Sequence, residues 1–197
     1  TGWFEDISMT TNGSLLAPRA AKLKELGLNR VNISLDSLDS DAFTLCVGKA
    51  NQLDSVLNGI QSAIDAGFTS VKINTVLSRH WTDDEVHDLL TYVETWPVIW
   101  RFIEYMPFQG DAFHGPTFDE WKAQLERVSG GILTEIHDVY GFGPATYYNL
   151  PSGKKIGFIF SMSHSYCDTC NRVRLTSDGQ MRLCLLRDDE ADLVSLV

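Results

Sequence analysis

Strand and helix patterns alternate through the first hundred residues, and this alternation limits the fold more than any other feature of the chain. Strand-like runs rich in Val, Ile and aromatic residues occupy 5–11, 30–37, 70–77 and 98–106, and helical patterns lie between them at 18–26, 52–66 and 83–95. Such alternation usually produces parallel strands joined by right-handed crossovers. The sequence therefore predicts an α/β fold.

Three of the predicted strands, those at 5–11, 30–37 and 70–77, are polar at every second position. Lys72 and Asn74 alternate with Val71, Ile73 and Thr75, and the strand at 30–37 shows the same pattern. Parallel strands buried on both faces are normally apolar throughout. The apolar face should therefore be covered by helices, and the polar face should line a wet or occupied space. This pattern favours part of a wide (β/α) barrel with a polar interior. An open sheet with a solvated edge is the alternative.

The pattern changes after Met106-Pro107, and we expect a second domain there. A helix is predicted at 118–128, followed by short strands at 131–138, 145–150, 156–162 and 172–186 and a hairpin turn at 177–179. The last segment, 188–197, begins with a helical pattern. We predict a partial barrel of four strands over 1–107, and a small α+β extension with antiparallel strands over 108–197.

Three of the four cysteines fall in this extension: Cys167 and Cys170 form a CxxC pair, and Cys184 follows. With His164 as a fourth ligand they could hold zinc. A redox pair would need the CxxC at a helix start beside a βαβ unit. Three thiolates alone could hold an iron–sulfur cluster with one open iron. The remaining cysteine, Cys46, is expected to be a buried structural thiol.

The distribution of charge points to a small anionic ligand. The net charge of −10 argues against nucleic acid and membrane partners. Residues 153–187 nevertheless carry six basic side chains and two acidic ones, and a merely solvated surface is the other interpretation. Arg172 and Arg174 should share one face of a strand, where paired guanidinium groups suit phosphate oxygens. A nucleotide beside an open metal site favours the cluster interpretation.

With these residues in view, the sequence resembles the molybdenum cofactor biosynthesis protein A family, the radical S-adenosylmethionine GTP 3′,8-cyclases. The resemblance covers essentially the whole chain. The matching blocks are TTNG, VNISLDSLD, VKINTV, RFIEYMP, GPATYY, IGFIFSMSHSYCDTCNRVRLTSDGQMRLCL and DDEADL. Each block alone is weak evidence, but their order and the cysteine spacing together are specific.

The resemblance implies a radical reaction on GTP. S-adenosylmethionine is cleaved to a 5′-deoxyadenosyl radical at one 4Fe-4S cluster, the radical takes hydrogen from C3′ of GTP, and the ribose then bonds to C8 of guanine. The product, 3′,8-cyclo-7,8-dihydro-GTP, passes to molybdenum cofactor biosynthesis protein C. A second 4Fe-4S cluster, on Cys167, Cys170 and Cys184, binds the guanine through its open iron. A cytoplasmic location is implied, and a homodimer is compatible with it.

The resemblance also assigns roles to individual residues. Thr10, Lys72, Arg172, Val173 and Arg174 match GTP contacts. Thr10 could instead be an ordinary hydroxyl at the end of a strand, with no ligand. Such an explanation is harder for Lys72, because a lysine between Val71 and Ile73 is costly to bury without an anionic partner.

Two further positions, Ser34 and Met106, match S-adenosylmethionine contacts. Ser34 could instead be a strand-end hydroxyl and Met106 a core residue. No catalytic side chain is expected within the chain.

The sequence departs from the family pattern at both ends. The CxxxCxxC motif that holds the first cluster, a Gly-Gly-Glu-Pro segment and a Gly-Gly tail are not in it. We therefore expect a fragment with the last four barrel strands, which does not turn over alone and whose first cluster would sit on a preceding segment. Two rivals remain: another radical S-adenosylmethionine enzyme with an auxiliary cluster, and a zinc-stabilised nucleotide-binding module.

Overall fold

The computed structural model describes residues 3–50, 52–78, 80–107, 115–137, 143–184 and 190–192. The chain divides into two compact units, one of residues 1–138 with 145–165 and the other of residues 139–144 with 166–197. The larger unit contains a seven-stranded sheet, and the smaller unit contains a three-stranded sheet. Over the described residues, no helix has the length and apolar character that crossing a membrane requires.

The seven-stranded sheet has the order β1-β2-β3-β4-β7-β6-β5. Its five neighbouring strands from β1 to β7 are parallel, and β6 and β5 continue the sheet in antiparallel fashion. The strands are β1 (Ser8–Thr11), β2 (Arg30–Ser34), β3 (Ser70–Leu77), β4 (Ile99–Glu104), β5 (Thr134–Ile136), β6 (Thr146–Asn149) and β7 (Lys155–Ile159). The predicted mostly parallel α/β fold is confirmed, and among the described strands the order has two free ends.

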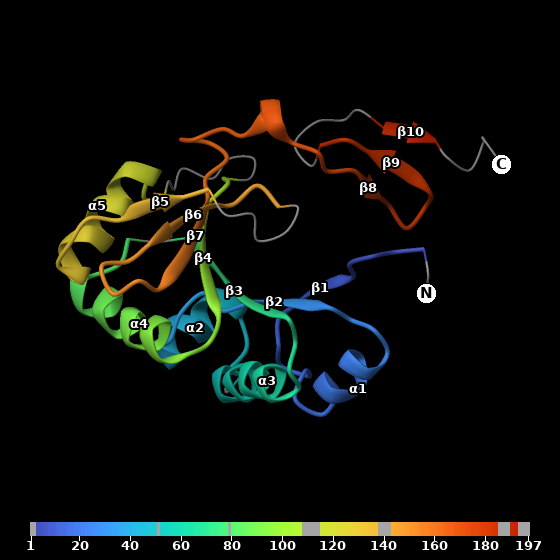
Figure 1. Cartoon of the computed structure of the whole chain (residues 1–197), viewed down its shortest axis with the longest axis horizontal. Coiled ribbons are helices and arrows are strands. Elements are labelled where there is room, and N and C mark those ends of the chain that lie inside the picture. Colours follow the sequence, from blue (N-terminus) through green and yellow to red (C-terminus); the bar gives the residue numbers. More distant parts are fainter. Residues whose placement is uncertain are drawn as a thin grey trace. The chain divides into compact units, whose positions relative to one another are not determined.

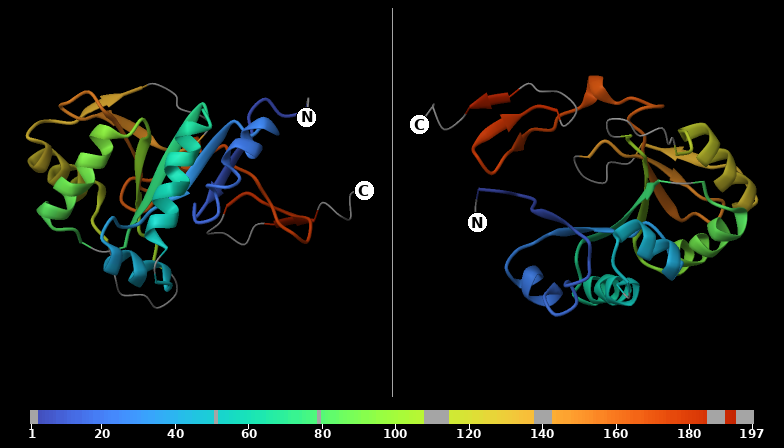
Figure 2. Two further views of the ribbon diagram at one scale, coloured as in Figure 1. Left: turned by 90° about the horizontal axis from the view of Figure 1, so that it is seen from below. Right: turned by 180° about the vertical axis from the view of Figure 1, so that it is seen from behind.

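Helices cover one face of this sheet, as the apolar strand positions predict. Figures 1 and 2 show α1 (Ala20–Glu25), α3 (Leu53–Asp65), α4 (Asp83–Thr95) and α5 (Phe118–Ser129) on that side. Helices α4 and α5 each begin with a capping box, Thr82 with Glu85 and Thr117 with Glu120. The core between sheet and helices includes the fully buried side chains of Ile33, Ile60, Ile73, Leu89, Trp100, Phe102, Trp121 and Leu125.

One helix was not expected. Helix α2 (Ser40–Val47) begins at Asp39, whose side chain accepts a hydrogen bond from the Ala42 amide, and it buries only Phe43. Because most of this short helix faces outward, Cys46 is exposed. The prediction that Cys46 is a buried thiol was wrong.

The position of β7 corrects the predicted extension. Strand β7 pairs in parallel with β4, so that Trp100 lies opposite Ile156 and Phe102 opposite Phe158. An apolar run of this length indicates a buried strand but not the partner or direction of pairing. The large sheet thus has five parallel strands rather than four, and strand pairing continues across the boundary predicted after residue 107.

The smaller unit contains η1 (Cys167–Thr169), β8 (Arg174–Leu175), β9 (Gln180–Arg182) and β10 (Glu190–Asp192). The predicted hairpin is confirmed: β8 and β9 are antiparallel, and Gly179 takes φ 85° in their turn. The helix expected over 188–197 is wrong where the structure describes this segment, because residues 190–192 pair with β9 as a strand. The other residues of that segment lie outside the described ranges.

A buried threonine ties three of the parallel strands together. The Thr75 hydroxyl on β3 donates to the Leu35 carbonyl at 2.6 Å and accepts from the Trp100 indole nitrogen on β4 at 2.8 Å. All of this lies in the core, where lost hydrogen bonds are not replaced by water.

Replacing Thr75 by Val should lower the free energy of unfolding by about 2 to 4 kcal/mol, because two buried polar groups each lose a partner without a large change in volume. Urea unfolding followed by tryptophan fluorescence measures this. The same change at Thr91, which is exposed and bonded only within its own helix, is the control and should have a small effect. Equal losses in both variants would contradict the role of the Thr75 hydroxyl.

Candidate functional site

Strand register places residues from five strands of the large sheet in one row, and four of them have polar side chains. Ser34 is opposite Asn74, Asn74 opposite Arg101, Arg101 opposite Gly157, and Gly157 opposite Tyr147. Residues opposite each other in paired strands point to the same face. The row therefore lies on the polar face.

A second row on the same face runs from β1 to β3. Thr10 is opposite Asn32, and Asn32 is opposite Lys72. The register thus brings together three of the predicted contacts, Thr10, Ser34 and Lys72, on one side of the sheet.

Arg101 connects these rows by hydrogen bonds. Its Nε donates to Oδ1 of Asn74 and its Nη2 donates to Oδ1 of Asn32, both at 2.9 Å. The Asn32 amide nitrogen in turn donates to the Thr10 hydroxyl at 3.4 Å. A chain of neutral polar groups therefore holds the guanidinium in place.

Lys72 is buried on the polar face, with 2% of its surface exposed. Its Nζ donates to the Tyr147 hydroxyl at 3.4 Å and lies 5.9 Å from the centroid of the Tyr147 ring. Burial, together with the positive charges of Arg101 and Arg30, lowers the pKa of Lys72 to about 8. Below about pH 8 the ammonium group is therefore mostly charged, and it loses its charge as the pH rises above this pKa.

Arg101 was not among the predicted site residues, although its position in the sequence marks it as a buried cation. Arg101 stands between Trp100 and Phe102 as Lys72 stands between Val71 and Ile73, and it is 8% exposed. Burial lowers the pKa of Arg101, while a hydrogen bond to Tyr147 opposes this shift. Within the described residues, its hydrogen bonds reach neutral groups alone, those of Asn32, Asn74 and Tyr147.

The other positive charge near Lys72 is already compensated. Arg30 forms an ion pair with Asp6 through two hydrogen bonds, both at the edge formed by β1 and β2. Lys72 and Arg101 are thus two buried cations on the polar face, and a group with several negative oxygens can interact with both members of such a pair.

The residues predicted to contact S-adenosylmethionine lie at the ends of β2 and β4. Ser34 is the half-buried last residue of β2, and Met106 follows β4 by two residues and is also half-buried. Near Ser34, the Asp36 carboxylate accepts the Val76 amide at 2.8 Å, and burial raises its pKa. At the end of β4, the buried Glu104 carboxylate accepts the amides of Met162 and Ser163.

The smaller unit contains the other predicted site residues. Cys167 and Cys170 are exposed, and Cys184 is partly buried. The backbone and guanidinium of Arg172 donate to Cys170 and lower the pKa of its thiol. Arg172 also donates from Nη2 to the Tyr166 hydroxyl at 3.0 Å, and its guanidinium lies 5.2 Å from the centroid of that ring.

Arg172 and Arg174 were expected to share one face of a strand, and the exposure of residues 172–174 alternates accordingly. Both are half-buried, whereas Val173 between them is 58% exposed. Of the three residues, only Arg174 lies in strand β8, where it is opposite Arg182 of β9. The hairpin thus gathers positive charge.

The cysteines suit a metal cluster in their chemistry. A thiol whose pKa is lowered supplies the thiolate that a metal requires, and the Cys170 thiol has this property. Over the described residues, however, no three His, Cys, Asp or Glu side chains are gathered into a metal-binding group. His164, considered as a fourth zinc ligand, stacks on Phe118 with ring centroids 5.1 Å apart. The cluster ligands therefore remain a prediction.

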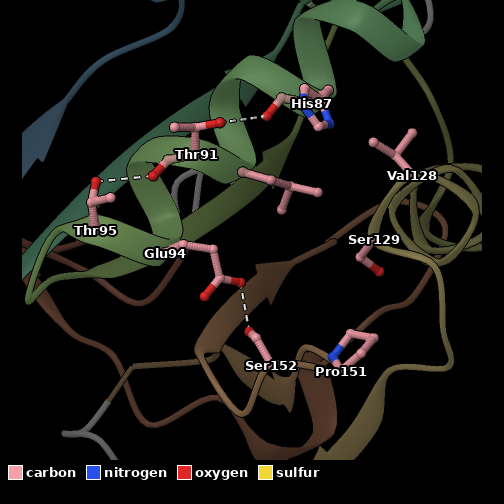
Figure 3. A pocket seen from close by; sticks show the side chains of 9 residues that line it. His87, Thr91, Glu94, Thr95, Val128, Ser129, Pro151 and Ser152 are labelled. Atoms are coloured by element: carbon pink, nitrogen blue, oxygen red, sulfur yellow. Dashed lines mark hydrogen bonds between the residues drawn. The ribbon is translucent and has the colours of Figure 1, made fainter.

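A shallow pocket of about 360 Å³ lies on the helical side of the large unit (Figure 3). It is lined by α4 residues including His87, Thr91 and Glu94, by the end of α5, and by the turn at Pro151 and Ser152. The Ser152 hydroxyl donates to Glu94 at 2.5 Å across it. Since its lining contains no Lys or Arg, this pocket does not suit a triphosphate.

Two family models match the chain in succession. Residues 3–93 match the Radical SAM superfamily, and residues 98–197 match Molybdenum Cofactor Synthesis C. Among solved structures, that of Streptococcus suis SuiB bound to S-adenosylmethionine has a TM-score of 0.66 at 13% identity, covering 95% of this chain and 45% of that one. A radical SAM methyltransferase from Sphaerobacter thermophilus gives 0.51 at 15% identity, over 62% of this chain and 36% of its own.

Curated relatives share more of the sequence. A GTP 3′,8-cyclase of Moorella thermoacetica is 42% identical over 96% of this chain and 59% of its own length. The GTP 3′,8-cyclase of Trichodesmium erythraeum is 45% identical over 93% of this chain and 57% of its own. The chain thus spans somewhat more than half the length of these relatives. With a family model matching half of its residues, and with radical SAM similarity before it, the chain belongs to the Molybdenum Cofactor Synthesis C family.

Proposed function

We propose that the chain is part of a GTP 3′,8-cyclase and contributes most of its GTP site. Relatives with this name are 42% and 45% identical to nearly all of the chain. Residues 1–107 would belong to the radical S-adenosylmethionine part and residues 108–197 to the part with the auxiliary cluster. The first family model ends at residue 93 and the second begins at residue 98, so that the second includes β4.

The observation that carries this proposal is the pair of buried cations on the polar face of the sheet. Lys72 and Arg101 are at least nine-tenths buried, and the hydrogen bonds described for Arg101 reach neutral groups. A phosphate group at this face would interact favourably with both cations. A triphosphate has the charge and the oxygens to bridge two such groups.

The remaining assignments follow from position and chemistry. Thr10, bonded to Asn32 in the same network, would add a hydroxyl contact to GTP. Arg172 and Arg174 would bind phosphate oxygens, with the Val173 backbone between them.

S-adenosylmethionine would be contacted by Ser34 and Met106. Both lie at the carboxyl ends of parallel strands, where ligands bind in α/β folds.

We assign Cys167, Cys170 and Cys184 as ligands of a 4Fe-4S cluster. When bound there, the cluster would supply an open iron site for the guanine ring. Arg172, which donates to Cys170, would hold that thiolate deprotonated. The motif CxxxCxxC for the other cluster is not among the four cysteines of this sequence. Cyclisation by the 197-residue chain alone is therefore not expected, and the complete enzyme would pass its product to molybdenum cofactor biosynthesis protein C.

Anaerobic reconstitution with iron and sulfide should give the visible absorption of an iron–sulfur cluster, with iron found by metal analysis. Replacing Cys170 by Ser should abolish this absorption, because a thiolate ligand is lost. Cys46→Ser is the matched control and should load normally, since Cys46 is exposed on α2 outside the predicted ligand set. Bound zinc without iron would instead support a zinc-stabilised nucleotide-binding module.

The affinity for GTP should fall as the pH rises through about 8. Below this pKa Lys72 is charged and attracts phosphate; above it the charge is lost, so affinity should decline by up to about tenfold per pH unit. Calorimetric titrations between about pH 6.5 and about pH 9.5 measure the decline. Lys72→Gln should bind weakly and lack the transition. A transition that persists in this variant would exclude Lys72 as its source.

Replacing Arg172 and Arg174 together by Ala should weaken GTP binding by at least about tenfold, because two charge-assisted contacts are lost. Binding of S-adenosylmethionine should change little, and equilibrium binding of both ligands gives the comparison. Arg127→Ala, which removes an exposed ion pair with Asp83, is the control for the loss of a surface arginine. An equal loss of affinity for both ligands would indicate a role in folding.

A further inference from the structure

Tyr147 lies between the two buried cations, and the proposed function gives it no task. It belongs to β6, the antiparallel strand beyond β7, and is 5% exposed. Its hydroxyl accepts from Lys72 Nζ at 3.4 Å and also accepts from the Arg101 guanidinium. One phenol oxygen is thus shared by cations from two other strands, β3 and β4.

The approach of Tyr147 to Arg101 depends on the glycine between them. Gly157 of β7 is opposite both residues in the register. A Cβ atom at Gly157 would lie 2.9 Å from Cγ of Arg101 and 3.0 Å from Cε1 of Tyr147. Because such contacts are too close, a side chain here would displace the arginine, the tyrosine or both. Because Gly157 has no side chain, β7 leaves room for Tyr147 to reach the Arg101 guanidinium.

A tyrosine has an advantage over a carboxylate in this position. Asp or Glu would form an ion pair with each cation and cancel the charge available to a ligand. A phenol accepts the same hydrogen bonds while remaining neutral, and burial raises the pKa of Tyr147 while the charge of Arg101 lowers it. The two cations keep their orientation and their positive field.

We propose that Tyr147 is a positioning residue, whose hydroxyl holds Lys72 and Arg101 as an oriented, charged pair for the phosphate groups of GTP. The proposal rests on the assignment of the polar face as a GTP site. The charged groups around Lys72 are Arg101 on β4, Arg30 on β2 and Asp6 before β1, and Tyr147 is the neutral group that faces it from β6.

The test compares Tyr147→Phe with Tyr148→Phe. Tyr148 is the next residue of the same strand and is also buried. Its hydroxyl donates to the Glu135 carboxylate, whereas the Tyr147 hydroxyl accepts from Lys72. Both changes remove one hydroxyl and retain the ring. At about pH 7, Tyr147→Phe should weaken GTP binding about tenfold, whereas Tyr148→Phe should bind like the wild type.

A second experiment measures the pKa of Lys72 in the protein without any ligand. In protein labelled with ¹³C at lysine Cε, the chemical shift of Lys72 titrates with its ammonium group. Tyr147→Phe should move the pKa of Lys72 downward by about one unit, since the charged form loses an acceptor; Tyr148→Phe should leave it unchanged. An unchanged Lys72 titration in Tyr147→Phe would overturn the proposal whether or not GTP binds. Failure of the wild type to bind GTP, with the titration shifted as expected, would overturn the GTP assignment alone.

Gly157→Ala gives an independent variant that keeps every hydroxyl. It should lower GTP affinity and the pKa of Lys72 in the same direction as Tyr147→Phe, because it moves Tyr147 relative to the cations. Circular dichroism and the thermal midpoint identify a variant that has not folded. A folded Gly157→Ala protein with wild-type GTP affinity and Lys72 titration would contradict the positioning role.

Discussion

Parallel pairing in one register across β2, β3, β4 and β7 is the constraint on which the rest of the large unit depends. It places one side of every strand against helices and the other side on a shared polar face. On the helical side, the hydrogen bond between Trp100 and Thr75 joins β4 to β3 in this register. On the polar side, the same register places Asn74 opposite Arg101. Core packing and site geometry are thus two results of one set of backbone hydrogen bonds.

The polar face and the cysteine segment supply two different kinds of chemistry. The face offers fixed positive charge, held by neutral amides and a phenol. The cysteine segment offers thiols, one of which has its pKa lowered by Arg172. Binding and orientation are the tasks for which these residues are suited.

Local signals in the sequence predicted local structure well. The helices and the hairpin turn depend on chemistry between neighbours in the chain, and the hairpin and the helices α4 and α5 were found where expected. Lys72 was identified because its neighbours on the strand are apolar, and the same reasoning applied to Arg101 would have succeeded. Tyr147 could not be found this way. Tyr147 contacts Arg101 only because β7 lies between β4 and β6 and pairs in parallel with β4. No pattern within the sequence of either strand predicts that pairing.

That pairing has a consequence for the order of assembly. Opposite residues in β4 and β7, such as Trp100 and Ile156, are far apart in the chain, so their pairing closes a long loop and tends to come late. During synthesis from the amino end, β1 to β4 could associate while the chain beyond them was still being made. Until β7 had emerged, Arg101 would lie on an open strand edge with no tyrosine beside it. A nascent chain would therefore bury the side chains between β1 to β4 and their helices before Ile156 and Phe158 completed the core and before Tyr147 reached the two cations.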